Sequence, residues 1–221
     1  MTVDGSVAHI GQQIDPESQS VAIDGVVLPV APGLVYYLLN KPRGVVSTAD
    51  DPEGRPTVVG LVPAEPRVFP IGRLDVDSEG LLILTNDGDL TLRLTHPRYG
   101  IEKTYVALVD GHPGKAALRR LTSGVELDDG MARAVRARVL DRRGGESLVE
   151  IVMAEGRKRE VRRMCDAVTH PVQRLIRTGI GALRDPALRP GRWRFLTIDE
   201  VHGLYGAAEG EVEGTESDGE G

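Results

Sequence analysis

The sequence contains a single cysteine, Cys165, among its 221 residues. One cysteine excludes a disulfide framework, and no group of Cys and His residues has the close spacing of a zinc site. We therefore expect no metal centre, a buried Cys165 and a reducing compartment, the cytoplasm.

Long apolar runs and nucleotide-binding loops are also missing. No segment approaches the roughly 20 apolar residues that cross a bilayer, and the N-terminus lacks the basic start and apolar run of a signal peptide. The phosphate-cradling G-x-x-x-x-G-K-[ST] and dinucleotide G-x-G-x-x-G patterns do not occur. These absences predict a soluble, non-exported protein that has no membrane partner and needs no small-molecule cofactor.

Positive charge is absent from both ends of the chain. Residues 1–30 contain no Lys or Arg, and residues 207–221 carry six Asp or Glu and no basic residue. The formal net charge of −6 is therefore due to the tail, and the rest of the chain is neutral. Within it, residues 155–194 hold eleven Lys or Arg against four Asp or Glu. This local excess suits a phosphate backbone, although a solvated Arg-rich surface would have the same composition.

The sequence divides into three parts. Residues 1–30 combine short extended segments with Asp-Gly turns and predict a small β-rich piece. After a Pro/Gly/Ala linker at 29–33, residues 31–206 mix strands and helices without regular alternation, which predicts an α+β domain around a mixed, mainly antiparallel sheet with flanking helices. The Gly- and Glu-rich segment 207–221 has too little apolar content to fold and is expected to be a disordered tail.

Several segments of the middle part have clear patterns. Strands are predicted at 35–39, 67–71, 80–85, 102–109, 135–141 and 146–153. The run Leu81–Leu84 is apolar throughout, as in a central strand covered on both faces, and NDGD at 86–89 predicts the turn that ends it. In segment 158–168 one helical stripe faces a core; its members are Val161, Met164, Cys165 and Val168.

Three carboxylates at alternate positions precede this apolar run, in the segment GRLDVDSEGLLILTNDG at 72–88: Asp75, Asp77 and Glu79. A calcium loop would need a bidentate Glu seven residues after Glu79, where the chain has Asn86. Asp75 and Asp77 could instead cap or solvate a turn. A third interpretation is a catalytic carboxylate that attacks an electron-poor carbon, which requires a cation nearby to keep it ionised. The pattern alone leaves the second and third open.

The segment 72–88 resembles the signature of the RsuA-type family of ribosomal pseudouridine synthases. The resemblance continues in order through LLNKPRGVVST (38–48), LTHPRYGIEKTYVALV (94–109), EGRKREVRRM (155–164), VQRLIRTGIG (172–181) and LRPGRWRFLT (188–197). It implies the pseudouridine synthase fold and isomerisation of a uridine to pseudouridine in ribosomal RNA, with the large-subunit synthase B branch as the nearest match. A synthase acting on small-subunit RNA, and a catalytically silent RNA-binding or ribosome-assembly factor, remain alternatives. A glycosidase would need a second catalytic carboxylate, and aromatic residues for sugar stacking make up only 4% of the chain.

The resemblance also assigns roles to residues. It makes Asp75 the nucleophile, Tyr105 the aromatic that packs against the target uracil, and Arg162 the cation that pairs with Asp75. Lys103 and Tyr105 are two residues apart, so in a strand both leave on the same face. Arg73 is expected to hold or replace the displaced nucleotide, unless it forms a structural ion pair with Asp77 or Glu79. Contacts to the RNA backbone are expected from Lys41, Arg43, Lys103, Arg157, Lys158, Arg159 and Arg163.

The N-terminal part departs from the family pattern. Family members usually begin with a small S-four-type RNA-binding domain whose helical first half is Arg-rich, and residues 3–28 resemble only its β-rich second half. The sequence therefore predicts a partial S-four-type domain at 1–30, which fits an internal start in a longer reading frame. We expect a monomer whose partner is ribosomal RNA.

Overall fold

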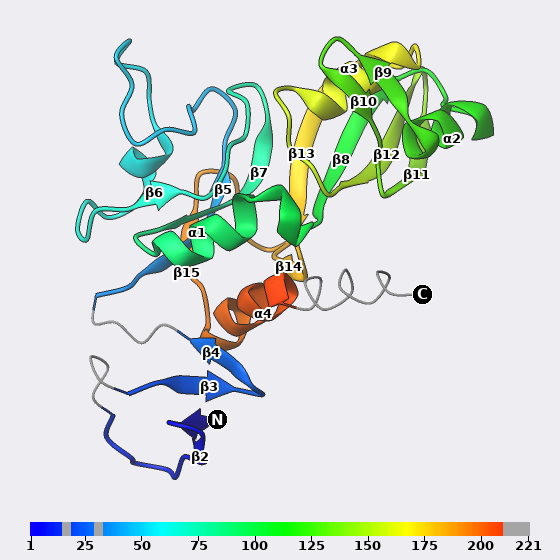
Figure 1. Ribbon diagram of the computed structural model, residues 1–221. Coiled ribbons are helices and arrows are strands. Elements are labelled where there is room, and N and C mark those ends of the chain that lie inside the picture. Colours follow the sequence, from blue (N-terminus) through cyan, green and yellow to red (C-terminus); the bar gives the residue numbers. More distant parts are fainter. Residues whose placement is uncertain (15–18, 29–32, 210–221) are drawn as a thin grey trace, which may run out of the picture.

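The computed structural model describes residues 1–14, 19–28 and 33–209. In this part of the chain nine strands form one large sheet, in the order β11-β12-β8-β13-β7-β5-β15, with β14 paired to β13 and β6 paired to β7 (Figure 1). The strands are β5 (Tyr36–Lys41), β6 (Phe69–Pro70), β7 (Glu79–Thr85), β8 (Lys103–Asp110), β11 (Arg136–Arg143), β12 (Glu146–Met153), β13 (Val172–Ile180), β14 (Leu183–Arg184) and β15 (Trp193–Phe195).

The pairing of β7 with β13 is parallel, whereas the other pairings of this sheet are antiparallel. The prediction of an α+β domain around a mixed, mainly antiparallel sheet is therefore confirmed. A separate two-stranded hairpin consists of β9 (Val125–Leu127) and β10 (Gly130–Ala132).

Strand β7 is covered on both faces, as its continuous apolar run predicts. Leu81 and Ile83 belong to one core cluster, whereas Leu82 and Leu84 belong to another on the opposite face. Each of the four side chains is at most 3% exposed. Alternation along the strand sends neighbouring side chains to opposite faces, so a strand that is apolar throughout needs cover on both.

Helices pack on the two ends of the sheet (Figure 1). Helices α1 and α4 contribute to the core cluster that contains Leu81, while α2 and α3 contribute to a cluster over β8 and β12. The predicted stripe of α3 is buried in that cluster, with Cys165 only 2% exposed. The helices are α1 (Gly88–Thr95), α2 (Lys115–Ser123), α3 (Glu160–Ala167) and α4 (Ile198–Glu209), with 3-10 turns at Val58–Leu61 and Pro97–Tyr99.

The predicted turn at NDGD is also the start of α1. Asp87 caps the helix, since its Oδ1 accepts hydrogen bonds from two backbone N–H groups of the first turn. Its Oδ2 accepts hydrogen bonds from the hydroxyls of Tyr36, at 2.7 Å, and Tyr205, at 2.6 Å. Burial, followed by these hydrogen bonds, raises the pKa of both tyrosines. One buried carboxylate thus joins β5, α1 and α4.

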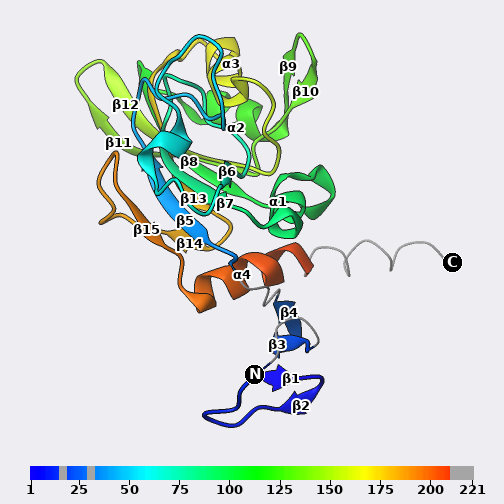
Figure 2. The same ribbon diagram turned by 90° about the vertical axis from the view of Figure 1, so that its left-hand side faces the viewer.

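The first part of the chain forms a small antiparallel sheet of β1 (Thr2–Val3), β2 (Ser6–Val7), β3 (Val21–Ile23) and β4 (Val26–Leu28). Both Asp-Gly turns are confirmed, since Asp4, Gly5, Asp24 and Gly25 all have positive φ. Helix α4 lies between this small sheet and the large one (Figure 2). The assignment to a partial S-four-type domain stays a prediction. Of the predicted linker, residues 29–32 lie outside the described part of the chain.

The predicted boundary of the acidic tail is wrong by three residues. Helix α4 continues through Glu209, and Ala208 is fully buried, because its apolar face packs on the core cluster that also contains Leu204 and Tyr205. Residues 210–221, for which disorder is predicted, lie outside the described residues. No helix in the described ranges is long and apolar enough to cross a bilayer.

Candidate active site

The loop between β6 and β7 carries Asp75 on a turn that other segments fix in place. The backbone N–H of Ser78 donates to the Asp75 carbonyl oxygen at 3.0 Å, which closes the turn. The N–H of Gly44 donates to the carbonyl oxygen of Val76 at 2.7 Å. Ser47 clamps Leu74, because its Oγ donates to the Leu74 carbonyl at 2.9 Å and accepts from the Leu74 N–H at 3.2 Å. The backbone is therefore held on both sides of Asp75.

Asp75 lies in the wall of a cavity of about 740 Å³. Tyr105 and Lys103 of β8 line the same cavity, so the prediction that they share a face of the strand is confirmed. The segment 153–161, which leads from β12 into α3, contributes a further wall. No ion pair or side-chain hydrogen bond between described residues uses the Asp75 carboxylate. It is a partly buried carboxylate on a rigid turn that is available to a ligand.

Arg162 lies beside this turn but does not form the predicted ion pair with Asp75. Its Nη2 donates to the backbone carbonyl of Asp77 at 3.1 Å and lies 3.5 Å from that residue's carboxylate, while Nη1 donates to the Val172 carbonyl at 3.0 Å. Burial lowers the pKa of the Arg162 guanidinium, and the charges of Asp77 and Asp75 oppose that shift. The expected direct pair is thus corrected. The planar guanidinium binds the turn after Asp75 and acts on Asp75 at longer range.

Two further cations surround the same turn. Arg159 donates to both carboxylate oxygens of Asp77 at 3.0 Å. Burial raises the pKa of Asp77, but the Arg159 hydrogen bond and the charges of Arg162 and Arg159 bring it below its ordinary value. Arg174 forms a bidentate pair with Glu79, which lowers the pKa of that carboxyl. Asp77 and Glu79 are therefore paired with arginines, whereas the Asp75 carboxylate pairs with none of the described residues and can react with a ligand.

The prediction that Lys41 contacts RNA is wrong. Its side chain is 0% exposed and its ammonium group donates to the carbonyl oxygens of Pro42, at 3.0 Å, and Val45, at 2.8 Å. Burial lowers the pKa of Lys41 to about 8, against the attraction of Asp77, Glu79 and Asp75. Lys41 supports the bend after β5, and phosphate cannot reach it.

This shift predicts a pH dependence of stability that Lys41→Met removes. The folded protein releases the Lys41 proton near pH 8, whereas an unfolded lysine holds it up to about 10.5, so the unfolded state binds more protons in between. Stability then rises with pH, and we expect the wild type to gain about 2 kcal/mol relative to the variant between pH 8 and pH 10. Urea unfolding of both proteins measures the difference. Parallel pH profiles would contradict the prediction.

Arg157 and Arg163 are also committed to protein contacts. Arg163 forms two 2.9 Å hydrogen bonds with the Asp129 carboxylate. Arg157 donates to Asp129 and to Glu160, among other acceptors. Both arginines hold the β9–β10 hairpin against the start of α3, because Asp129 lies at the tip of that hairpin. Contact of either arginine with the RNA backbone stays a prediction.

The remaining predicted RNA contacts are exposed or lie at the cavity. Arg43 and Lys158 are exposed, and neither side chain forms an ion pair or a hydrogen bond with another described residue. Arg73 is exposed and borders the cavity. It does not form the ion pair with Asp77 or Glu79 that was the alternative for it. Asp77 pairs with Arg159 and Arg162 instead, and Glu79 pairs with Arg174. Lys103 is partly buried in the cavity wall. Arg73, Lys103 and Lys158 thus line the cavity that contains Asp75, whereas Arg43 does not.

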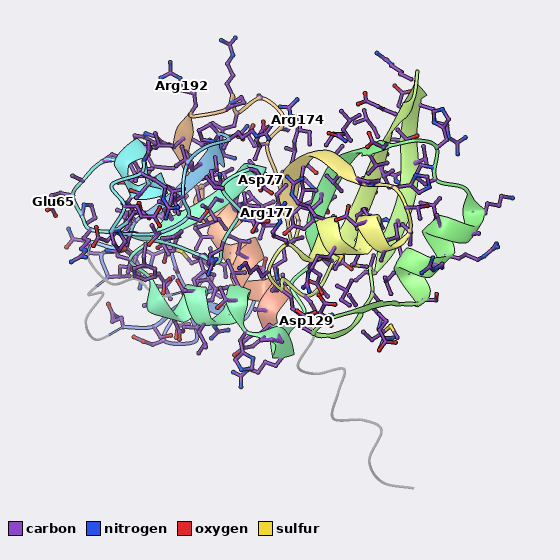
Figure 3. The ribbon with its side chains drawn as sticks, turned by 90° about the horizontal axis from the view of Figure 1, so that it is seen from above. Glu65, Asp77, Asp129, Arg174, Arg177 and Arg192 are labelled. Carbon is purple, nitrogen blue, oxygen red and sulfur yellow. The ribbon has the colours of Figure 1, made fainter. Side chains whose placement is uncertain are left out.

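Arg177 was missed by the sequence analysis. It lines the cavity from β13 and is only 5% exposed (labelled in Figure 3). The signal was present in the alternation of VQRLIRTGIG, where Leu175 and Arg177 are two residues apart and share one face of the strand. Ser47 was not predicted either, because nothing in the sequence around it indicates the two hydrogen bonds that it forms with the Leu74 backbone.

Comparisons with known proteins agree with this geometry. Residues 35–167 match the family described as RNA pseudouridylate synthase. An uncharacterized RNA pseudouridine synthase of Mycobacterium leprae is 45% identical over 208 residues, which cover 92% of this chain and 81% of that protein. Ribosomal large subunit pseudouridine synthase B of Bacillus subtilis is 44% identical over 178 residues, or 79% of this chain and 73% of the relative.

The similarity of the fold to a solved structure supports the same family. A crystal structure described as that of a pseudouridylate synthase superposes with a TM-score of 0.70 at 28% identity, over 92% of this chain and 87% of the other. On sequence and fold together, the chain belongs to the RNA pseudouridylate synthase family and is a pseudouridine synthase.

Proposed function

We propose that the protein converts a uridine of large-subunit ribosomal RNA to pseudouridine, with Asp75 as the nucleophile. The observation that carries the proposal is the Asp75 carboxylate, which pairs with none of the described residues, is fixed on a turn held by Ser47 and Gly44, and lines the same cavity as Tyr105. The large-subunit assignment is supported by the name of the Bacillus subtilis relative, a ribosomal large subunit synthase.

The cavity suits a single extruded nucleotide. A base that is stacked in RNA cannot reach the buried carboxylate, so the uridine must leave the stack at a cost of a few kcal/mol. The volume of about 740 Å³ lies within the range of small-molecule sites. Inside, Tyr105 offers a ring against which uracil can pack, and Asp75 reaches either the anomeric carbon or the base.

Three routes are open to Asp75. It can attack the sugar's anomeric carbon, add to the uracil ring, or assist an elimination that forms an unsaturated sugar. Each route needs an ionised carboxylate. The charges of Arg162 and Lys41 interact with that of Asp75. Net isomerisation exchanges a C–N bond for a C–C bond within one nucleotide.

Exposed cations around the opening offset the cost of extrusion. Arg43, Arg73 and Lys158 can contact phosphates, which position RNA without reading its sequence. Arg73 borders both the cavity and the turn of Asp75, so it is placed to occupy the space that the displaced nucleotide leaves. Each of these contacts predicts salt-dependent binding.

Release of tritium from carbon 5 tests the function. The purified protein is incubated with large-subunit and small-subunit ribosomal RNA transcripts that contain 5-tritiated uridine, because forming the new C–C bond expels the proton at that carbon. We expect release of about one tritium per large-subunit transcript, at one uridine whose modification is lost in cells lacking the protein. Release from small-subunit RNA alone would overturn the target. Binding without release from either RNA would indicate a silent RNA-binding factor.

A further inference from the structure

Arg177 lines the cavity from β13, the central strand of the large sheet. Strand β13 runs between β7 and β8, and in its register Arg177 lies opposite Tyr105 on one side and Gly80 on the other. Gly80 has no side chain, and a Cβ there would lie only 2.2 Å from the Arg177 carbonyl oxygen, so the two backbones approach closely. Figure 3 labels Arg177 in the middle of the molecule, where the two parts of the sheet meet.

The guanidinium of Arg177 is only partly satisfied by the protein. Its Nε donates to the carbonyl oxygen of Leu81 at 2.7 Å, but its Nη2 is buried and has no hydrogen-bond partner among the described residues. No ion pair between described residues involves Arg177. Burying a guanidinium without a carboxylate or a full set of acceptors is unfavourable, and such orphaned donors are rare in folded proteins. A ligand with an electron-rich oxygen would complete it.

Two other buried cations lie near Asp75, but neither of them lines the cavity. The Nε of Arg162 also has no hydrogen-bond partner among the described residues. Arg162 donates to two backbone carbonyls and pairs with Asp77, and it does not line the cavity. Lys41 donates to two carbonyls and is fully enclosed. Arg177 alone of these three combines a cavity position with an unpartnered donor.

The reaction creates negative charge where such a donor would be useful. If the bond between the anomeric carbon and N1 breaks first, N1 keeps the electron pair and uracil becomes an anion whose charge spreads to its two carbonyl oxygens. If Asp75 adds to the ring instead, the electron pair moves to the oxygen at C4 as an enolate. The electron pair of the ring then forms the bond from C5 to the anomeric carbon, and the bond that Asp75 has formed, to the anomeric carbon or to C6, breaks and returns the carboxylate. The C5 proton then leaves, and N1 gains a proton.

From these observations we propose that Arg177 donates a hydrogen bond from its terminal nitrogen to a carbonyl oxygen of the extruded uracil and stabilises the negative charge on the ring. The inference rests on the proposed function and adds an electrostatic role that none of the routes available to Asp75 supplies. Tyr105, directly across the strand pair, would hold the base over the guanidinium. Arg177 is thus a catalytic residue that acts on the base, while Asp75 acts on the carbon that receives its attack.

Kinetics of Arg177→Met and Arg177→Lys test the inference. We expect Arg177→Met to lower the single-turnover rate about 100- to 1,000-fold while the Kd for RNA changes less than about threefold, since the lost donor acts on developing charge. Arg177→Lys keeps a donor and a charge and should recover about tenfold of the loss. Arg174→Gln, on the same strand but paired with Glu79 outside the cavity, is the matched control and should react like the wild type.

Sulfur substitution in the substrate separates this role from a structural one. RNA with 2-thiouridine or 4-thiouridine at the target places a weaker acceptor at one ring position. We expect one of the two to slow the wild type about tenfold and to have no added effect in Arg177→Met, because residue and atom belong to one interaction. Additive effects for both sulfur positions, or a full rate in Arg177→Met, would overturn the inference. Inactivity of the wild type on uridine would instead refute the proposed function, and thermal unfolding shows whether each variant is folded.

Discussion

Replacing Asp75 by Asn is expected to stop turnover, with a loss in kcat of about 10⁴-fold or more, as for removal of other enzymatic nucleophiles. Asn has the same shape as Asp but carries no charge and is a poor nucleophile, so all three routes open to Asp75 fail together. Because no described residue pairs with the Asp75 carboxylate, the variant should fold normally and bind RNA with wild-type affinity. Tritium release under single-turnover conditions and an RNA binding assay measure the two effects.

Asp77→Asn is the matched control two residues along the same turn. Its carboxylate pairs with Arg159 and Arg162, so this substitution should weaken the turn and lower stability while leaving measurable turnover. Equal activity of Asp75→Asn and the wild type would remove Asp75 from the chemistry. If Asp77→Asn were the inactive variant and Asp75→Asn the active one, the nucleophile would be Asp77.

Gly80→Ala is expected to destabilise the protein by about 3–5 kcal/mol, the largest effect on stability that the structure predicts. Two causes add. Gly80 has a φ of +112°, which residues with a side chain rarely adopt, and its added Cβ would lie 2.2 Å from the oxygen and 2.5 Å from the nitrogen of the Arg177 backbone. Relief requires β7 and β13 to separate where they form the parallel pair of the sheet. We expect the Tm to fall by about 10 °C or more.

Gly203→Ala provides the opposite control. Gly203 lies inside α4, is exposed, and nothing lies within 4 Å of an added Cβ, so alanine should stabilise the helix by about 0.5–1 kcal/mol. Calorimetry of both variants compares the same chemical change in two environments. A Gly80→Ala protein with the wild-type Tm would show that the β7–β13 contact is looser than described. A folded but slow variant would link this contact to the position of Arg177.

Two buried arginines near the turn of Asp75 have different roles. Arg162 holds the backbone of Asp77, and Arg177 lies across from Gly80 at the start of β7. Both are buried cations within reach of one carboxylate cluster. Both terminal nitrogens of Arg162 bind backbone carbonyls or Asp77, whereas the terminal Nη2 of Arg177 has no hydrogen-bond partner among the described residues.

The local pattern of the sequence was sufficient for the elements and for the family. Strand β7 follows from four successive apolar residues, α3 from the spacing of Val161, Met164, Cys165 and Val168, and the Asp-Gly turns from their residue types. The motif around Asp75 indicated the family that the comparisons confirm. These features are encoded within short segments, where periodicity and residue chemistry determine which face is buried.

The tertiary structure alone decided what each cation does. Lys41, Arg157 and Arg163 look like RNA contacts in the sequence, yet the fold buries the first and pairs the other two with Asp129. A basic residue has the same composition whether it contacts phosphate or protein, so charge along the chain cannot distinguish these uses.

The partners of Asp75 needed the fold for the same reason. Arg162 and Arg177 lie about 90 and 100 residues after Asp75 in the chain, and the register of β13 between β7 and β8 determines which of them faces the cavity. Sequence therefore determined the elements, the family and the candidate nucleophile. Only packing between distant segments determined that Arg162 binds the turn while Arg177 lines the cavity with one nitrogen unpaired among the described residues, because hydrogen-bond partners depend on which backbone carbonyls the fold brings within reach.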